Sequence, residues 1–561
     1  MEKIKWMAAV ASIWIQCICG ASYAFAIYSS VLKSTQGYDQ STLDMVSVFK
    51  DIGANAGILS GLLYSAVTVR RGGGSRPWVV HLAGAIQCFA GYFLIWLSVI
   101  GVINRPPVPA MCCFMLMAAH AQTFFNTANV VTAVHNFPDY SGTVVGIMKG
   151  FLGLSGAVLV QVYQTFLKEN PSAFILMLAL LPTFVSLLFM CLVRIDQINS
   201  GDDKKHLNGF SAIALIVAGY LLILIILENV FTFPFWARLL TFVVLLLLLA
   251  SPLRIVVKAR QEDSLRLPQI PPNERTQLIN ESTIDSENFS TEEDSIEYPG
   301  KQMNLLQAMR TINFWLLFVA MLCGMGSGLA TINNMSQIGE SLGYTTVELN
   351  TLVSLWSIWN FLGRFGAGYV SDVFLHTRGW ARPLFMVLTL ATMTVGHVII
   401  ASGFPGNLFV GSVLVGVCYG SQWSLMPTIT SEIYGVVHMG TIFNTIAVSS
   451  PVGSSILSVL VIGYIYDTEA SGEGNSCYGT QCFMLSFFIL ACVSLFGFFV
   501  ALILFFRTRR FYMQILLRRN LAIRYLHISQ DIKEIAQLIM LSTTLIGVEM
   551  LNPHFSLKFR Y

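Results

Sequence analysis

The feature that most constrains this chain is a series of long apolar stretches along almost its whole length. A helix of roughly 20 mainly apolar residues crosses the hydrocarbon core of a bilayer while satisfying its own backbone polar groups. The sequence therefore predicts an all-α polytopic membrane protein with about 14 transmembrane helices. The expected spans lie at about 10–32, 43–67, 78–101, 108–134, 141–167, 171–193, 211–229, 236–256, 312–334, 348–370, 382–402, 407–429, 441–466 and 482–506.

Composition excludes several other classes of protein. Charged residues make up 11% of the chain, against about 25% in soluble domains. The formal net charge of +3 is too small to suggest a nucleic-acid partner. No Cys/His set has metal-ligand spacing, and no nucleotide-binding motif is present. No candidate nucleophile and base lie at the same depth in the membrane. We therefore expect no metal, no cofactor and no enzyme activity.

The loops that carry lysine and arginine predict the orientation of the chain. Cytosolic loops of membrane proteins are enriched in these residues. The cations cluster after the second, sixth, tenth and fourteenth spans, as Arg70, Arg71, Arg76, Arg194, Lys204, Lys205, Arg378, Arg382, Arg507, Arg509 and Arg510. These loops share one side of the membrane if both termini are cytosolic, and this is the orientation that we predict.

The polar segment at 257–308 is rich in Ser, Glu and Asp and is predicted to be a disordered cytosolic loop. Within it, Glu274, Leu278 and Ile279 fit the acidic dileucine sorting pattern of endolysosomal and vacuolar proteins. The alternative is a chance match in a charged loop. The pattern favours a vacuolar or other endomembrane location, with the plasma membrane as the alternative.

The first six and last six spans form an internal repeat. With an offset of 306 residues, the aligned pairs include Gly37 with Gly343, Tyr38 with Tyr344, Ile52 with Ile358 and Gly57 with Gly363. Two related six-helix halves with a site between them are a transporter arrangement. The expected segments are the N-terminal half at 1–195, two linking transmembrane helices at 196–256, the loop at 257–308, the C-terminal half at 309–510 and a cytosolic tail at 511–561.

Three stretches carry a family resemblance: IQCICGASYAFAIYSSVLKSTQGYDQSTLDMVSVFKDIGANAG near the start, HNFPDYSGTVVGIMKGFLGLSGA in the middle and SQWSLMPTITSEIYG late. As a set they are similar to the plant nodulin-like (nuclear-fusion-defective-like) family of the major facilitator superfamily. The resemblance covers about residues 1–510 and implies a membrane transporter fold. The family is also similar to monocarboxylate and oxalate/formate carriers, which implies a small organic anion as substrate.

The superfamily has a loop signature at the cytosolic end of the second helix of each half. Here its C-terminal copy matches Arg364, Gly368 and Asp372, which are spaced by four and share one helical face. The resemblance implies a conformational latch that holds the outward-facing state, and we call these three the latch residues. The alternative is an anchoring arginine and an ordinary helix-end aspartate. The N-terminal copy is degraded, because no Asp follows Gly61 at the matching place.

Lys149 lies inside the span that reads GTVVGIMKGFLGLSGAV, where a charge costs about 2.5–3.5 kcal/mol. Gly142, Gly146, Gly153 and Gly156 lie three, four or seven residues from it and share its face. A glycine face is a helix-packing face, so Lys149 is expected to point toward protein or a water-filled cavity. It is interpreted as a fixed cation for an anionic substrate. The alternative is a lysine that snorkels or has a structural partner.

Other polar and aromatic residues inside the spans are candidates for the same site. Gln122, Asn126 and Asn129 share one face of their span, which predicts either cavity lining or interhelical hydrogen bonds. In the second half Tyr419, Gln422 and Trp423 occupy the comparable position, and Tyr23 and Tyr28 are further candidates.

Asp51 and His120 are the candidates for proton coupling. Asp51 is alternatively an ordinary end-of-span charge, and Lys50 is not expected to be its partner because adjacent helical residues face apart. Cys477 and Cys482 lie in the last luminal loop, where an oxidising compartment permits a disulfide.

These features together favour a secondary active transporter that moves a small, anionic, proton-coupled organic solute by alternating access. The expected partners are the solute and the lipid bilayer. The alternative function is a non-transporting membrane regulator or sensor on a transporter scaffold, acting through the 257–308 loop or the tail.

Overall fold

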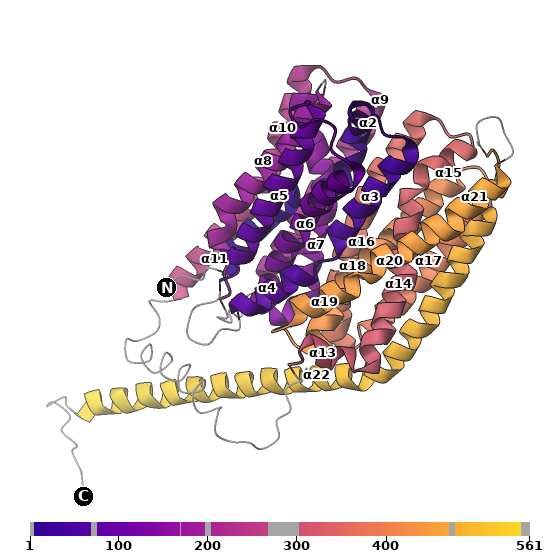
Figure 1. The fold of residues 1–561 in the computed structure, drawn as a ribbon. Helices are drawn as coiled ribbons and strands as arrows, with labels where there is room; N and C mark the ends of the chain where they lie inside the picture. The colour runs from indigo at the N-terminus through magenta and orange to yellow at the C-terminus, as the bar shows by residue number, and fades with distance from the viewer. Residues whose placement is uncertain are drawn as a thin grey trace, which may run out of the picture.

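The computed structural model describes residues 5–68, 76–168, 170–196, 203–266, 302–470 and 477–550. Within these ranges the chain is helical and contains no strand. Figure 1 shows two groups of long helices side by side, an indigo-to-magenta N-terminal group and a pink-to-orange C-terminal group.

The N-terminal group contains two broken helices. The first expected span is interrupted after Cys19 by a short 3₁₀ turn, and the second at Ala56–Gly57. Asp39 caps the second span by accepting a hydrogen bond from the Thr42 N–H (2.8 Å). The elements are α1 (Lys5–Cys19), η1 (Ala21–Ala24), α2 (Phe25–Gln36), α3 (Gln40–Asn55), α4 (Ile58–Thr68), α5 (Trp78–Val99), α6 (Val108–Asn136), η2 (Pro138–Tyr140), α7 (Ser141–Val162), the π-helical η3 (Tyr163–Leu167), α8 (Pro171–Phe189) and η4 (Met190–Leu192).

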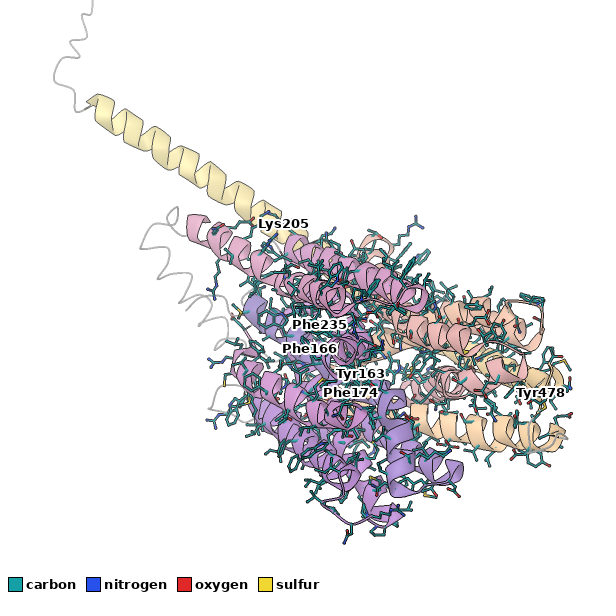
Figure 2. All side chains as sticks on the ribbon, turned by 90° about the horizontal axis from the view of Figure 1, so that it is seen from above. Tyr163, Phe166, Phe174, Lys205, Phe235 and Tyr478 are labelled. Carbon is teal, nitrogen blue, oxygen red and sulfur yellow. A yellow bond between two sulfur atoms is a disulfide. The ribbon has the colours of Figure 1, made fainter. Side chains whose placement is uncertain are left out.

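The extra pair of spans corresponds to α9 (Asp203–Val230) and α10 (Phe235–Ala250), followed by α11 (Pro252–Arg266). Helix α9 packs against α7 of the N-terminal half and α16 of the C-terminal half. Helix α10 is largely exposed, as expected of a lipid-facing helix, and Arg238 on it donates to the Gln164 carbonyl of η3 (2.7 Å). Helix η3 contacts both α8 and α10, and the rings of Tyr163 and Phe174, which are labelled in Figure 2, lie 5.1 Å apart between η3 and α8.

The C-terminal group repeats the six-span pattern, and its second span is a single long helix with a capping box formed by Thr345 and Glu348. The elements are α13 (Leu305–Met309), α14 (Ile312–Asn333), α15 (Met335–Ser341), α16 (Thr346–Arg378), α17 (Pro383–Ala401), α18 (Asn407–Tyr434), α19 (Met439–Ala447), α20 (Ser449–Ser455), the π-helical η6 (Ile456–Gly463), α21 (Tyr464–Glu469) and α22 (Gln481–Met550). Cys477 and Cys482 are joined by a disulfide.

All of the expected spans fall on helices, so the predicted fold class is confirmed. Twelve helical segments among the described residues are long and apolar enough to cross a membrane. The two expected spans outside that set are 43–67, which the break divides into α3 and α4, and 348–370, which lies on the more polar α16. Helix α22 continues without a break through residue 511, where the sequence predicts a separate tail.

Candidate functional site

Lys149 lies in the interior of the molecule, with only 1% of its surface exposed. Glycines let α7 approach α16 closely: a Cβ at Gly146 would lie 3.1 Å from the Arg364 carbonyl oxygen. The Lys149 ammonium points toward the second half, 5.0 Å from the centre of the Trp423 ring and 5.2 Å from that of Phe443. A cation over two aromatic faces is stabilised by their quadrupoles without being neutralised.

Arg364, near the middle of α16, is the second buried cation at this place (1% exposed). Its guanidinium donates to the Lys149 carbonyl (3.0 Å), to the Tyr23 hydroxyl (3.2 Å) and to Asn360 Oδ1 (2.7 Å). Its Cζ lies 5.8 Å from the centre of the Trp423 ring, so Lys149 and Arg364 share one indole. No Asp or Glu among the described residues forms an ion pair with either cation.

Amide side chains of the N-terminal half join α6 to the first span. Gln122 accepts a hydrogen bond from the Ser22 hydroxyl (2.7 Å), and Asn126 accepts one from the Gln16 amide (3.4 Å). Both are nearly buried, with 7% of their surface exposed. Tyr23, the neighbour of Ser22 in the chain, is 41% exposed, and its hydroxyl accepts a hydrogen bond from Arg364. Tyr23 therefore links these amide side chains to the Arg364 site.

Several other predicted site residues point elsewhere. Tyr28 is buried inside the N-terminal half, where its hydroxyl lies 3.8 Å from the Met115 sulfur. Gln422 packs against Gly324 within the C-terminal half. Asn129 is fully buried, and neither atom of its amide has a hydrogen-bond partner among the described residues. Tyr419 reaches the site indirectly, with its ring 6.4 Å from that of Trp423.

The prediction that Lys50 is not the partner of Asp51 is wrong, because the two form an ion pair of 3.1 Å. The long lysine side chain reaches around the helix, whereas the sequence argument considers only the direction of each Cβ. Asp51 also accepts a hydrogen bond from Asn333 of the second half (3.3 Å). His120 has different partners, Gln87 (2.9 Å) and the Ala56 carbonyl at the break in the second span (3.1 Å).

The latch residues all contact α7. Gly368 lies so close to Gly142 that a Cβ there would be 2.2 Å from the Gly142 carbonyl oxygen. Asp372 accepts hydrogen bonds from the N–H groups of Gly142 and Thr143 at the start of α7, where the helix dipole favours a negative charge. It also forms an ion pair with Arg382 (2.6 Å).

Arg382 completes this arrangement from the start of α17. It is 1% exposed and bonds Glu432 on α18 (2.7 Å) in addition to Asp372. Although Arg382 is buried, two carboxylates lie against its guanidinium and compensate its charge. The sequence predicts that Arg364 belongs with Gly368 and Asp372 in the latch, whereas its side chain lies at the Lys149 site.

The contact of α7 with α16 is one seam between the two halves, and a second seam, between α4 and α19, lies at the same end of the molecule. Gly61 on α4 packs against the Gly440 carbonyl and Thr441 on α19, which corresponds in the repeat to the contact of α16 with Gly142 on α7. Here the side-chain contacts join neutral groups, Ser65 with Thr441 (3.4 Å) and the Asn444 amide, which donates to the Ser60 hydroxyl (3.5 Å). The two seams are therefore unequal in charge.

Comparison with known proteins identifies the family of this chain. Residues 5–257 match the family model "Nodulin-like", and residues 299–514 match "NFD4, C-terminal domain". The chain belongs to the nodulin-like family. Among its nodulin-like relatives, Protein NUCLEAR FUSION DEFECTIVE 4 of Arabidopsis thaliana is 26% identical over 91% of this chain and 89% of that protein.

More distant matches support the same fold. "Probable transporter MCH1" of Candida glabrata is 26% identical over 32% of this chain and 39% of its own length. The solved structure of the proton:xylose symporter XylE, a major facilitator protein, superposes with a TM-score of 0.53 at 11% identity and covers 88% of this chain and 94% of that one. At this identity the likeness concerns the fold alone.

For this nodulin-like protein, sequence reasoning missed two parts of the site. Phe443 gave no signal, because a phenylalanine in an apolar span is ordinary. Arg364 did give one, since it is an arginine in the middle of a span, but the loop signature suggested the latch instead. The sorting residues Glu274, Leu278 and Ile279 lie outside the described residues.

Proposed function

We propose that this chain is a secondary active transporter that moves a small organic anion across the membrane by alternating access, coupled to protons. The observation that carries the proposal is the pair of buried cations, Lys149 and Arg364, which come from opposite halves and meet at Trp423. A buried charge is costly unless it is compensated. An anionic solute supplies the compensation that no described carboxylate provides.

The aromatic and hydroxyl groups around the cations favour an organic anion over an inorganic one. Trp423 and Phe443 offer apolar faces, while Arg364 also contacts the hydroxyl and the ring of the partly exposed Tyr23. Ligand sites commonly combine apolar walls with a few fixed polar groups. A carboxylate that contacts both cations, with its carbon skeleton on the rings, would use all of these groups.

Alternating access is supported by the unequal contacts between the halves at the two ends. The end with the latch residues is sealed by glycine contacts and by the Asp372 bonds to α7. A small cleft lies between the halves at each end: Asp51, Asn333, Ser454 and Ser458 line one, and Tyr140, Asp372 and His376 line part of the other, beside α9. We infer that the structure is the state closed to the cytosol.

Proton coupling is assigned to Asp51 and His120. Asp51 lies in the cleft, where it bridges the halves through Asn333. Both ring nitrogens of His120 have hydrogen-bond partners, Gln87 and the Ala56 carbonyl. A doubly protonated ring donates to both oxygens, while a neutral ring keeps both contacts if the Gln87 amide turns over. His120 is therefore held in place in either protonation state.

The test is uptake of a panel of labelled mono- and dicarboxylates into proteoliposomes, with and without a pH gradient. We expect at least one carboxylate to accumulate, and the imposed gradient to increase it. Lys149→Ala and Arg364→Gln should each lower that uptake by roughly 30-fold or more, because truncating one member of a buried charge contact costs about 2–5 kcal/mol.

Arg310→Gln serves as the matched control, since Arg310 is an exposed arginine just before α14. Its uptake should equal that of the wild type. Normal uptake by the Lys149 and Arg364 variants contradicts the assigned site. Loss of cellular function on deletion of residues 257–308, with no effect of either cavity variant, favours the regulator instead.

A further inference from the structure

The last helix of the protein is far longer than a membrane span. Helix α22 has 70 residues, about 105 Å at 1.5 Å per residue, whereas about 30 Å is enough to cross the hydrocarbon core. Figure 1 shows its yellow C-terminal part bending away from the bundle and running across the end of the molecule where α13 lies. We call residues 511–550 of α22 the arm.

The base of the arm packs against the connection between α16 and α17. Tyr512 is fully buried in a cluster with Leu375 and Ala381. The turn at Gly379 has a left-handed backbone (φ 68°), and the Leu516 side chain occupies the space beside it. This connection joins Asp372 to Arg382, the ion pair that holds the start of α7.

Two buried polar atoms at this base lack hydrogen-bond partners among the described residues: the Tyr512 hydroxyl and Oε2 of Glu432. Glu432 is already bonded to Arg382 through its other oxygen. The two groups are nevertheless neighbours: Tyr512 and Glu432 lie within hydrogen-bonding range of each other, but without the geometry of a full hydrogen bond. A small movement of the arm that completes this hydrogen bond removes the cost of two unsatisfied groups and fixes the orientation in which Glu432 meets Arg382.

The charge of the helix identifies what the arm contacts. From Arg507 to Gln530 the sequence holds no Asp or Glu, and the first acidic residue of α22 is Asp531. The arginines of this stretch are Arg507, Arg509, Arg510, Arg518, Arg519 and Arg524. They follow the end of a membrane span, where basic clusters on the cytosolic side are attracted to anionic lipid headgroups.

We propose that the arm binds the anionic lipid surface of the cytosolic leaflet, and that this binding presses Tyr512 toward the α16–α17 connection and stabilises the state closed to the cytosol. The proposal rests on the alternating access proposed above. It makes the lipid surface a regulator of the transporter, acting through Glu432 and Arg382 on Asp372.

The test follows closure directly, without transport. The rings of Tyr140 and His376, from opposite halves at this end, lie 5.3 Å apart. A Tyr140→Cys/His376→Cys protein with a protease site inserted in the 257–308 loop is reconstituted in phosphatidylcholine vesicles, with and without phosphatidylserine. After oxidation and cleavage, the crosslinked halves migrate together on a gel.

We expect phosphatidylserine to raise the crosslinked fraction several-fold. Adding Arg518→Gln, Arg519→Gln and Arg524→Gln should abolish that rise, whereas Arg254→Gln, Lys258→Gln and Arg260→Gln, an equal loss of charge on α11, should retain it. Tyr512→Phe keeps the ring and removes the hydroxyl, so the arm should still bind vesicles but the rise should disappear.

An equal crosslinked fraction in the two kinds of vesicle overturns the proposal. So does a rise that persists in the Arg518/Arg519/Arg524 variant, or one that requires a cytosolic protein fraction instead of phosphatidylserine. Failure of anion uptake leaves the crosslinking result intact, so the failure of the proposed function and the failure of this proposal are distinguishable.

Discussion

At the scale of the residue, the spacing of glycines around Lys149 is enough to predict that its helix face packs against protein. The structure agrees, because the lysine is buried and α7 lies against α16. The partner cation cannot be predicted from spacing, since Arg364 meets Lys149 only after two halves more than 200 residues apart are assembled. The role of Lys149 as a substrate ligand stays a prediction, and that of Arg364, which the sequence assigns to the latch, belongs to the function proposed above.

Trp423 gives a separate test at this scale, because its ring serves both cations. Replacing it with leucine removes the ring quadrupole, and we expect the KM for the transported anion to change by roughly 3- to 30-fold, as losing a cation–π contact of about 0.7–2 kcal/mol implies. Trp423→Phe keeps an aromatic face and should change KM less. Equal effects of the two substitutions would show that the site needs only apolar bulk.

At the scale of the element, hydropathy locates the spans but not their irregularities. The break between α3 and α4, the π-helical η3 and η6 and the full length of α22 leave no mark in an apolar pattern, because each depends on tertiary contacts or on register within the helix. The glycine-rich seam between α7 and α16 is the exception: its small residues are visible in the sequence and allow the helices to approach.

Gly368→Ala tests that seam. The added Cβ would lie 2.2 Å from the Gly142 carbonyl oxygen, so the helices have to separate. We expect a shift away from the state closed to the cytosol, seen as a fall in crosslinking of the Tyr140→Cys/His376→Cys pair. Gly366→Ala on the same helix is the control, because a Cβ there meets nothing within 4 Å. An unchanged crosslinked fraction for Gly368→Ala would argue against a tight seam.

At the scale of the whole molecule, the two-half architecture follows from the sequence repeat, whereas the position of the extra helices does not. Helices α9 and α10 are nearly featureless in sequence, yet α9 contacts both halves and Lys5 on α1 pairs with Asp203 at its start (2.8 Å). The composition of α9 and α10 suggests a simple link between the halves. In the structure, however, α9 packs against both α7 and α16, where the two halves meet. Only three-dimensional packing distinguishes a simple linker from a helix that packs against both halves.

Location is the remaining prediction at this scale. If Glu274, Leu278 and Ile279 form a sorting signal, replacing Leu278 and Ile279 with alanine should move a fluorescent fusion from endomembranes to the cell surface. The control is the double variant Thr276→Ala/Gln277→Ala, which changes two neighbouring positions that the pattern leaves open and should not move the fusion. An unmoved Leu278/Ile279 variant would show that the pattern is a chance match.

The placement of Lys149 and Arg364 on opposite halves also affects the empty carrier. When the seam is closed, two positive charges share one indole at a depth where water screens them little, so their repulsion opposes closure. In the transport cycle that we propose, the anionic solute acts as the counterion that allows the protein to pass through its sealed state. We therefore expect efflux from preloaded vesicles to be fast when the outer solution contains the same anion, and slow when it contains none.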